Sequence, residues 1–144
     1  MGKPGPEDHE RKYPIQDQLD PEQRKTILDH SKNGELACAV AFQIVENRNI
    51  PADEIGMYAN QMKIRLVKCQ LGLFGYQPEK KIVKKIPKVD ASLQKAINDK
   101  SMDNRLSCIQ VWQIASELGV PKLSVSNACE TLSIKIHSCQ LGAF

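Results

Sequence analysis

An internal duplication constrains this chain more than any other feature of its sequence. When the sequence is shifted by 70 residues, residues 20–74 align with residues 90–144 without a gap, and 16 of the 55 aligned positions are identical. Each copy ends on nearly the same six residues, CQLGLF at 69–74 and CQLGAF at 139–144. A match at one constant offset indicates two copies of one structural unit. The predicted organisation is a flexible N-terminal segment (1–19), copy one (20–74), a Lys-rich linker (75–89) and copy two (90–144).

The residues of each copy predict three helices. Asp20 and Asp90 are good N-caps for the first helix. Apolar residues at helical spacing predict a second helix over residues 35–48 in copy one and 105–118 in copy two. A short turn and a third helix should follow, because Asn and Gly readily take the left-handed conformation and a proline comes two residues later, as in Asn49-Ile50-Pro51 and Gly119-Val120-Pro121.

A β-strand should follow the third helix. Residues 64–69 and 134–139 alternate in polarity and are rich in β-branched side chains. A preceding segment of the copy is a candidate partner for this strand, and the linker is a candidate for one further extended strand. The predicted fold class is therefore mainly α with short β-strands, built from two repeated three-helix units that each end in a strand.

Composition narrows the classes of protein to consider. The chain is 41% hydrophobic and 26% charged, as is ordinary for a globular domain. No apolar run approaches the roughly 20 residues of a membrane-spanning helix, and residues 1–18 lack the apolar centre of a secretory signal. Five cysteines, an odd number, favour reduced thiols. These features predict a cytoplasmic protein without a membrane partner.

The segment IASELGVPKLSVSNACETL, residues 114–132, resembles a bacterial helix-turn-helix. Ala115, Gly119 and Val125 stand at the usual separations, and the strand that follows makes copy two similar to winged-helix domains. The resemblance is close over about 20 residues and loose over the rest of the copy. It is weaker in copy one, where Val45 and Asn49 stand at the places of Ala115 and Gly119.

The resemblance implies DNA binding, with the third helix in the major groove. If Val125, Ala128 and Leu132 face inward, the outward positions in copy two are 123, 124, 126, 127, 130 and 131. The corresponding face of copy one comprises residues 53, 54, 56, 57, 60 and 61 and begins with two acidic residues. The alternative is that both faces are simply solvated. The candidate DNA contacts are Lys122, Ser124, Ser126 and Asn127, with Lys63, Arg65, Lys68, Lys84 and Lys85 as candidate phosphate contacts.

The distribution of formal charge along the chain bears on two functional hypotheses. Each copy is formally neutral, whereas the linker carries five lysines against one glutamate. The linker favours contact with DNA phosphates, although a solubilising connector would have the same composition. We therefore expect non-enzymatic DNA binding in transcription regulation, and the alternative is a protein-interaction adaptor or homodimer with the same fold. No motif of a catalytic site or cofactor site is found, so no enzyme activity and no cofactor are predicted.

The cysteines recur with the repeat. Cys38 and Cys69 lie as far apart in copy one as Cys108 and Cys139 do in copy two. Four repeated thiols would suit zinc, an iron–sulfur cluster or redox chemistry. No CxxC pair is present, so apolar packing is the favoured interpretation and no metal is predicted. We expect the two cysteines of each copy to approach one another beside the Leu and Phe of the CQLGxF ending.

Overall fold

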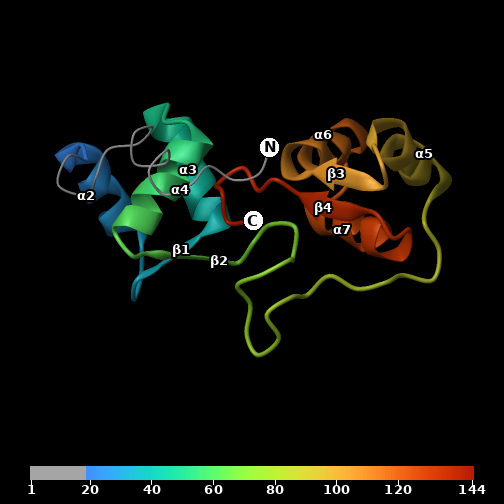
Figure 1. Ribbon diagram of the computed structural model, residues 1–144, viewed down its shortest axis with the longest axis horizontal. Coiled ribbons are helices and arrows are strands. Elements are labelled where there is room, and N and C mark those ends of the chain that lie inside the picture. Colours follow the sequence, from blue (N-terminus) through green and yellow to red (C-terminus); the bar gives the residue numbers. More distant parts are fainter. Residues whose placement is uncertain (1–18) are drawn as a thin grey trace. The chain divides into compact units, whose positions relative to one another are not determined.

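The computed structural model describes residues 19–144, which are mainly helical with short strands, as the sequence predicts (Figure 1). The chain divides between Leu66 and Val67 into two compact units. The first unit therefore ends before the CQLGLF sequence that closes copy one. Of the N-terminal segment predicted to be flexible, only Leu19 lies within the described residues, and it is buried.

Copy one contains α2 (Pro21–His30), β1 (Glu35–Ala37), α3 (Cys38–Arg48), α4 (Ala52–Gln61) and β2 (Arg65–Val67). The Asp20 side chain caps α2 by accepting a hydrogen bond from the backbone N–H of Glu22, as predicted. Helix α3 ends at Asn49, whose φ of 54° is left-handed. The predicted stop and restart between the second and third helices is therefore confirmed in copy one.

Copy two contains α5 (Ala91–Lys100), β3 (Arg105–Ser107), α6 (Cys108–Leu118), α7 (Lys122–Thr131) and β4 (Lys135–His137). Asp90 caps α5, and Gly119, with φ of 64°, ends α6. Strand β3 pairs in parallel with β4, with Leu106 opposite Ile136. Strand β1 pairs with β2 in copy one. The strand predicted after each third helix is therefore confirmed, although it is shorter than predicted.

The prediction that the second helices begin at residues 35 and 105 is wrong. Both helices begin three residues later, at Cys38 and Cys108, because the preceding residues form β1 and β3. Pairing with a strand 30 residues further along the chain overrides the local helical pattern. In copy two a local signal was present, since Ser107 and Gln110 form a capping box that marks the true helix start. No strand is formed within the linker.

The duplication extends to individual hydrogen bonds. Ile64 N–H donates to the Ala59 carbonyl and Ile134 N–H to the Cys129 carbonyl, both at 2.8 Å. The first residue of the final strand is also held in the same way in both copies. The Arg65 N–H donates to the Gly34 carbonyl, and the Lys135 N–H donates to the Asn104 carbonyl. The two copies are therefore built on one backbone plan despite identity at only 16 of 55 positions.

The core of copy two includes residues from the end of copy one. Ile97, Leu106 and Ile114 are fully buried, and Cys69 and Leu71 lie in the same cluster. Leu73 and Phe74 pack against that cluster. The CQLGLF sequence at the end of copy one is therefore part of the hydrophobic core of the second unit.

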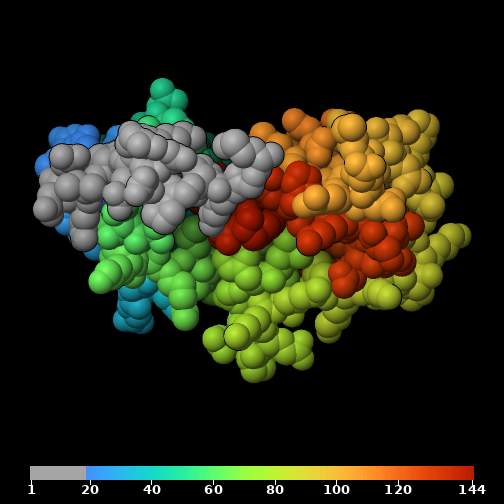
Figure 2. Space-filling view, viewed as in Figure 1, coloured from blue at the N-terminus to red at the C-terminus, as the bar shows by residue number. Residues whose placement is uncertain are grey.

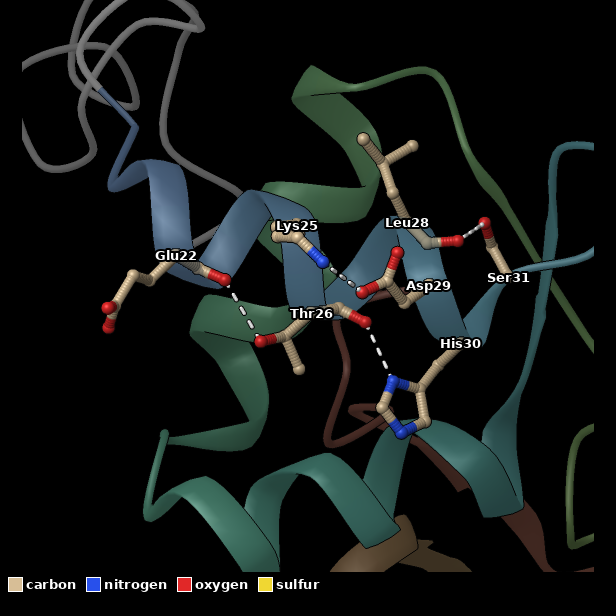
Figure 3. A network of polar contacts seen from close by, with 7 residues as sticks. All are labelled: Glu22, Lys25, Thr26, Leu28, Asp29, His30 and Ser31. Atoms are coloured by element: carbon tan, nitrogen blue, oxygen red, sulfur yellow. Dashed lines mark hydrogen bonds and ion pairs between the residues drawn. The ribbon is translucent and has the colours of Figure 1, made fainter.

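A polar network on α2 is made of contacts within one helix (Figure 3). Lys25 pairs with Asp29 at 3.0 Å, and the Thr26 hydroxyl donates to the Glu22 carbonyl at 2.9 Å. The His30 Nδ1 lies 2.7 Å from the Thr26 carbonyl oxygen. All these partners are four residues apart, so the network stabilises the helix and brings no distant groups together.

Candidate functional site

The Lys-rich linker lies along the outer side of α7. The backbone N–H of Lys84 donates to the Asn127 Oδ1, and that of Ile86 donates to the Thr131 Oγ1, both at 2.9 Å. Lys81 pairs with Glu130 at 3.4 Å. Figure 2 shows the yellow-green linker surface directly against the orange-red surface of copy two. We call residues 82–86, which make these backbone contacts, the strap.

The N-terminal end of the strap is hydrogen-bonded to the CQLG sequence of copy one. The N–H groups of Ile82 and Val83 donate to the Gly72 carbonyl at 2.8 and 3.3 Å, and the Val83 side chain is buried. Gly72 has a φ of 77°, and a Cβ there would lie 2.6 Å from Leu123 Cδ1 on α7. The positive φ and the close approach of the strap and α7 both favour glycine at this position.

The predicted DNA contacts on α7 are largely occupied within the unit. The prediction that Ser126 faces outward is wrong, because only 1% of it is exposed and its hydroxyl donates to the Lys122 carbonyl. The Asn127 carboxamide oxygen is an acceptor for the strap. Ser124 stays partly exposed. The strap covers a side of α7 that the pattern of apolar residues alone assigned to solvent.

The third helix of copy one is also less open than predicted. Gly56 and Met57, assigned to its outer face, are both buried. Asp53 and Asn60 on the same predicted face are exposed. The acidic start of this face is thus retained, and the outward face predicted from the helical pattern is smaller in both copies.

The candidate phosphate contacts have different surroundings. Lys84 and Lys85 are exposed on the strap, and neither forms an ion pair within residues 19–144. Lys122 is partly exposed, with its Nζ 4.5 Å from the centre of the Trp112 ring. Arg65 is paired with Glu35. Two more candidates, Lys63 and Lys68, are exposed.

The position of the linker changes the distribution of charge. Residues 67–144, which form the second unit, carry eleven basic and six acidic residues, a formal charge of +5. Residues 19–66 carry six basic and seven acidic residues, a formal charge of −1. The excess of positive charge therefore belongs to one folded unit that contains copy two, rather than to a separate connector.

None of the five cysteines, all of which lie in the described part of the chain, forms a disulfide, and four of them are buried. Cys69, Cys108 and Cys129 are buried, and Cys139 is partly exposed. Burial raises the pKa of the Cys69 and Cys108 thiols, and it raises the pKa of Cys129 to about 12. Within the described part of the chain, no group of three or more histidine, cysteine or acidic side chains is arranged to hold a metal ion.

The contacts of Cys108 bear on the cysteine pairing predicted for copy two. In copy two the Gln140 side chain, next to Cys139, lies 3.5 Å from the Cys108 sulfur, and Cys139 acts electrostatically on the Cys108 thiol. This agrees with the expected approach of Cys108 and Cys139. In copy one, Cys38 belongs to the first compact unit and Cys69 to the second. Cys69 lies in the core cluster of copy two together with Cys108.

Asn127→Ala tests whether the strap is held by the contact seen here. The substitution removes an acceptor of a backbone N–H and should lower the local stability of the strap by about 0.5–1.5 kcal/mol. Limited trypsin digestion should therefore cut after Lys84 and Lys85 several times faster than in the unmodified protein. Gln113→Ala, an exposed position on α6, is the control and should leave the cleavage rate unchanged. Equal rates for both variants would show that the strap does not depend on its contact with Asn127.

No protein family, curated protein or solved structure matches this chain. Its functional assignment therefore depends on the residues and their geometry. Among the helices of residues 19–144, none is both long enough and apolar enough to cross a membrane.

Proposed function

We propose that this protein binds DNA without catalysis, through a basic C-terminal unit that contains one of two helix-turn-helix-like repeats of winged-helix type. The observation that carries the proposal is the formal charge of +5 on residues 67–144, with Lys84 and Lys85 exposed on the strap. A basic surface of this kind attracts the phosphate backbone of nucleic acids. Gene regulation is the setting that the helix-turn-helix resemblance suggests.

The proposed contacts are chiefly to phosphates. Ser126 is buried and the Asn127 oxygen accepts a hydrogen bond from the strap, so neither is available to base edges in this conformation. Lysine side chains on phosphates position a protein on DNA but carry little sequence information. Binding should therefore be strong at low salt and should discriminate weakly between sequences.

A salt titration with mixed-sequence duplex DNA tests this proposal. Affinity should fall steeply with salt, and Lys84→Ala with Lys85→Ala should weaken binding to all duplexes alike, lowering the salt slope by roughly 2. Lys95→Ala is the matched control, because this lysine is already paired with Asp99 on α5. Fluorescence anisotropy of a labelled duplex measures all three proteins. If no duplex is bound even at low salt, DNA binding is excluded.

The second candidate function is a protein-interaction adaptor. It is supported by the occupied face of α7 and by exposed apolar side chains of copy two, of which Met102 at 78% and Ile109 at 50% are the most exposed. Exposed apolar side chains of this size are common at protein contacts but are also found on ordinary surfaces. Failure of DNA binding at low salt would favour this candidate.

A further inference from the structure

Three cysteines from separate segments meet in the second unit. Cys69 follows β2, Cys108 begins α6, and Cys139 follows β4. Cys69 and Cys108 belong to one buried cluster. The Gln140 Nε2 lies 3.5 Å from the Cys108 sulfur, which places the loop that contains Cys139 against the same cluster. The tertiary fold thus gathers thiols that are far apart in sequence.

The two CQLGxF loops have the same backbone geometry and contact one another. In each loop the cysteine N–H donates to the phenylalanine carbonyl, at 3.2 Å from Cys69 to Phe74 and 3.0 Å from Cys139 to Phe144. The two phenylalanine rings meet edge to face with their centroids 6.1 Å apart. In each loop the cysteine is hydrogen-bonded to the phenylalanine through the backbone. The contact between the two phenylalanine rings therefore brings the loops of Cys69 and Cys139 together.

The thiols of this cluster also act on one another electrostatically. Burial is the largest cause that raises the pKa of Cys69 and Cys108, hydrogen bonds lower it, and the charge of Cys139 raises the pKa of both thiols further. Such an influence weakens with distance, so it agrees with the contact of the loops. Cys139 is partly exposed, whereas Cys69 and Cys108 are buried. A dissolved oxidant therefore reaches Cys139 first.

We propose that Cys139 and Cys69 are a redox pair that a hydroperoxide converts to a disulfide joining the two CQLGxF loops. Cys69 is the partner because the contact of Phe74 with Phe144 joins its loop to the loop of Cys139. This proposal does not depend on the proposed DNA binding. A disulfide joins only two sulfur atoms, so it does not require the three or more ligands of a metal site.

The reaction proceeds in two balanced steps. Cys139 gives up its thiol proton, and its thiolate attacks the terminal oxygen of the hydroperoxide. The S–O bond forms as the O–O bond breaks, which leaves a sulfenic acid on Cys139, and the departing hydroxide or alkoxide takes up the proton from the thiol and leaves as water or an alcohol. The Cys69 sulfur then attacks the Cys139 sulfur, the S–S bond forms, and the sulfenic oxygen leaves as water with the thiol proton. Two thiols are oxidised by two electrons, and the hydroperoxide is reduced by the same two.

Peroxide treatment of the folded, full-length protein tests the proposal. Mass spectrometry of the non-reduced protein should show a loss of two hydrogen atoms, and peptide mapping should find Cys69 joined to Cys139 until dithiothreitol is added. Cys139→Ser should abolish this product. Cys129→Ala should retain it, since copy one carries Ala59 at the equivalent position and Cys129 is outside the loops.

A second variant separates the chemistry from effects on folding. In Cys69→Ala the sulfenic acid of Cys139 has lost its partner, so labelling by dimedone should increase several-fold. The proposal is overturned if Cys139 is oxidised without a cross-link in the unmodified protein. It is also overturned if the disulfide maps to another pair, joins two chains, or forms only in urea.

Discussion

Replacing Ile114 with alanine is expected to lower the free energy of unfolding by about 2–5 kcal/mol. Ile114 lies on α6, is fully buried, and belongs to the central cluster of copy two. Shortening its side chain removes apolar contacts and leaves a cavity that the surrounding helices fill only in part. Urea unfolding followed by tryptophan fluorescence measures the loss, because Trp112, the only tryptophan, lies on the same helix.

The control for this substitution lies five residues earlier on α6. Ile109 is 50% exposed, so Ile109→Ala should change the free energy of unfolding by less than about 1 kcal/mol. Both variants remove the same atoms from the same helix, and they differ in burial. If both variants lower the free energy of unfolding equally, Ile114 is not more deeply buried than Ile109.

Gly75→Ala should be the second strongly destabilising substitution, with an expected loss of about 2–4 kcal/mol. Gly75 has a φ of 82°, which strains any residue with a Cβ. An added Cβ would also lie 2.5 Å from the Lys68 nitrogen and 2.6 Å from the Val67 Cα. These are backbone atoms, so a change of rotamer cannot relieve the clash.

Gly142→Ala provides a matched control for the steric part of this effect. Gly142 has the same φ of 82°, but nothing lies within 4 Å of its added Cβ. This variant should lose about 1–2 kcal/mol, the conformational cost alone. The same urea titration compares the two. If Gly142→Ala lowers the free energy of unfolding as much as Gly75→Ala does, the positive φ alone accounts for the destabilisation, without the close approach to Lys68.

The sequence alone was sufficient for the repeat and for most of its local structure. The constant offset identified two copies, and the caps at Asp20 and Asp90 placed the first helix of each. Asn49 and Gly119 located the turn before the third helix. These predictions succeeded because capping and left-handed turns depend on side chains within a few residues of the feature itself.

Contacts between distant segments were decided by the tertiary structure. The apolar spacing that predicts the second helices extends the prediction over β1 and β3, and only pairing with the strands after the third helices makes these residues strands. The position of the strap over α7 likewise depends on residues more than 40 positions apart, since Lys84 bonds Asn127 and Ile86 bonds Thr131.

For the candidate sites too, the sequence predicted the residue types, and the tertiary structure decided their positions. The residue types in the sequence indicated repeated cysteines and a Lys-rich linker, but not where either would lie. The fold places the linker on α7 and gives one unit a charge of +5, and it gathers Cys69 with Cys108 in the core of copy two. Burial of apolar surface and satisfaction of backbone hydrogen bonds depend on the whole chain, so no local pattern contains them.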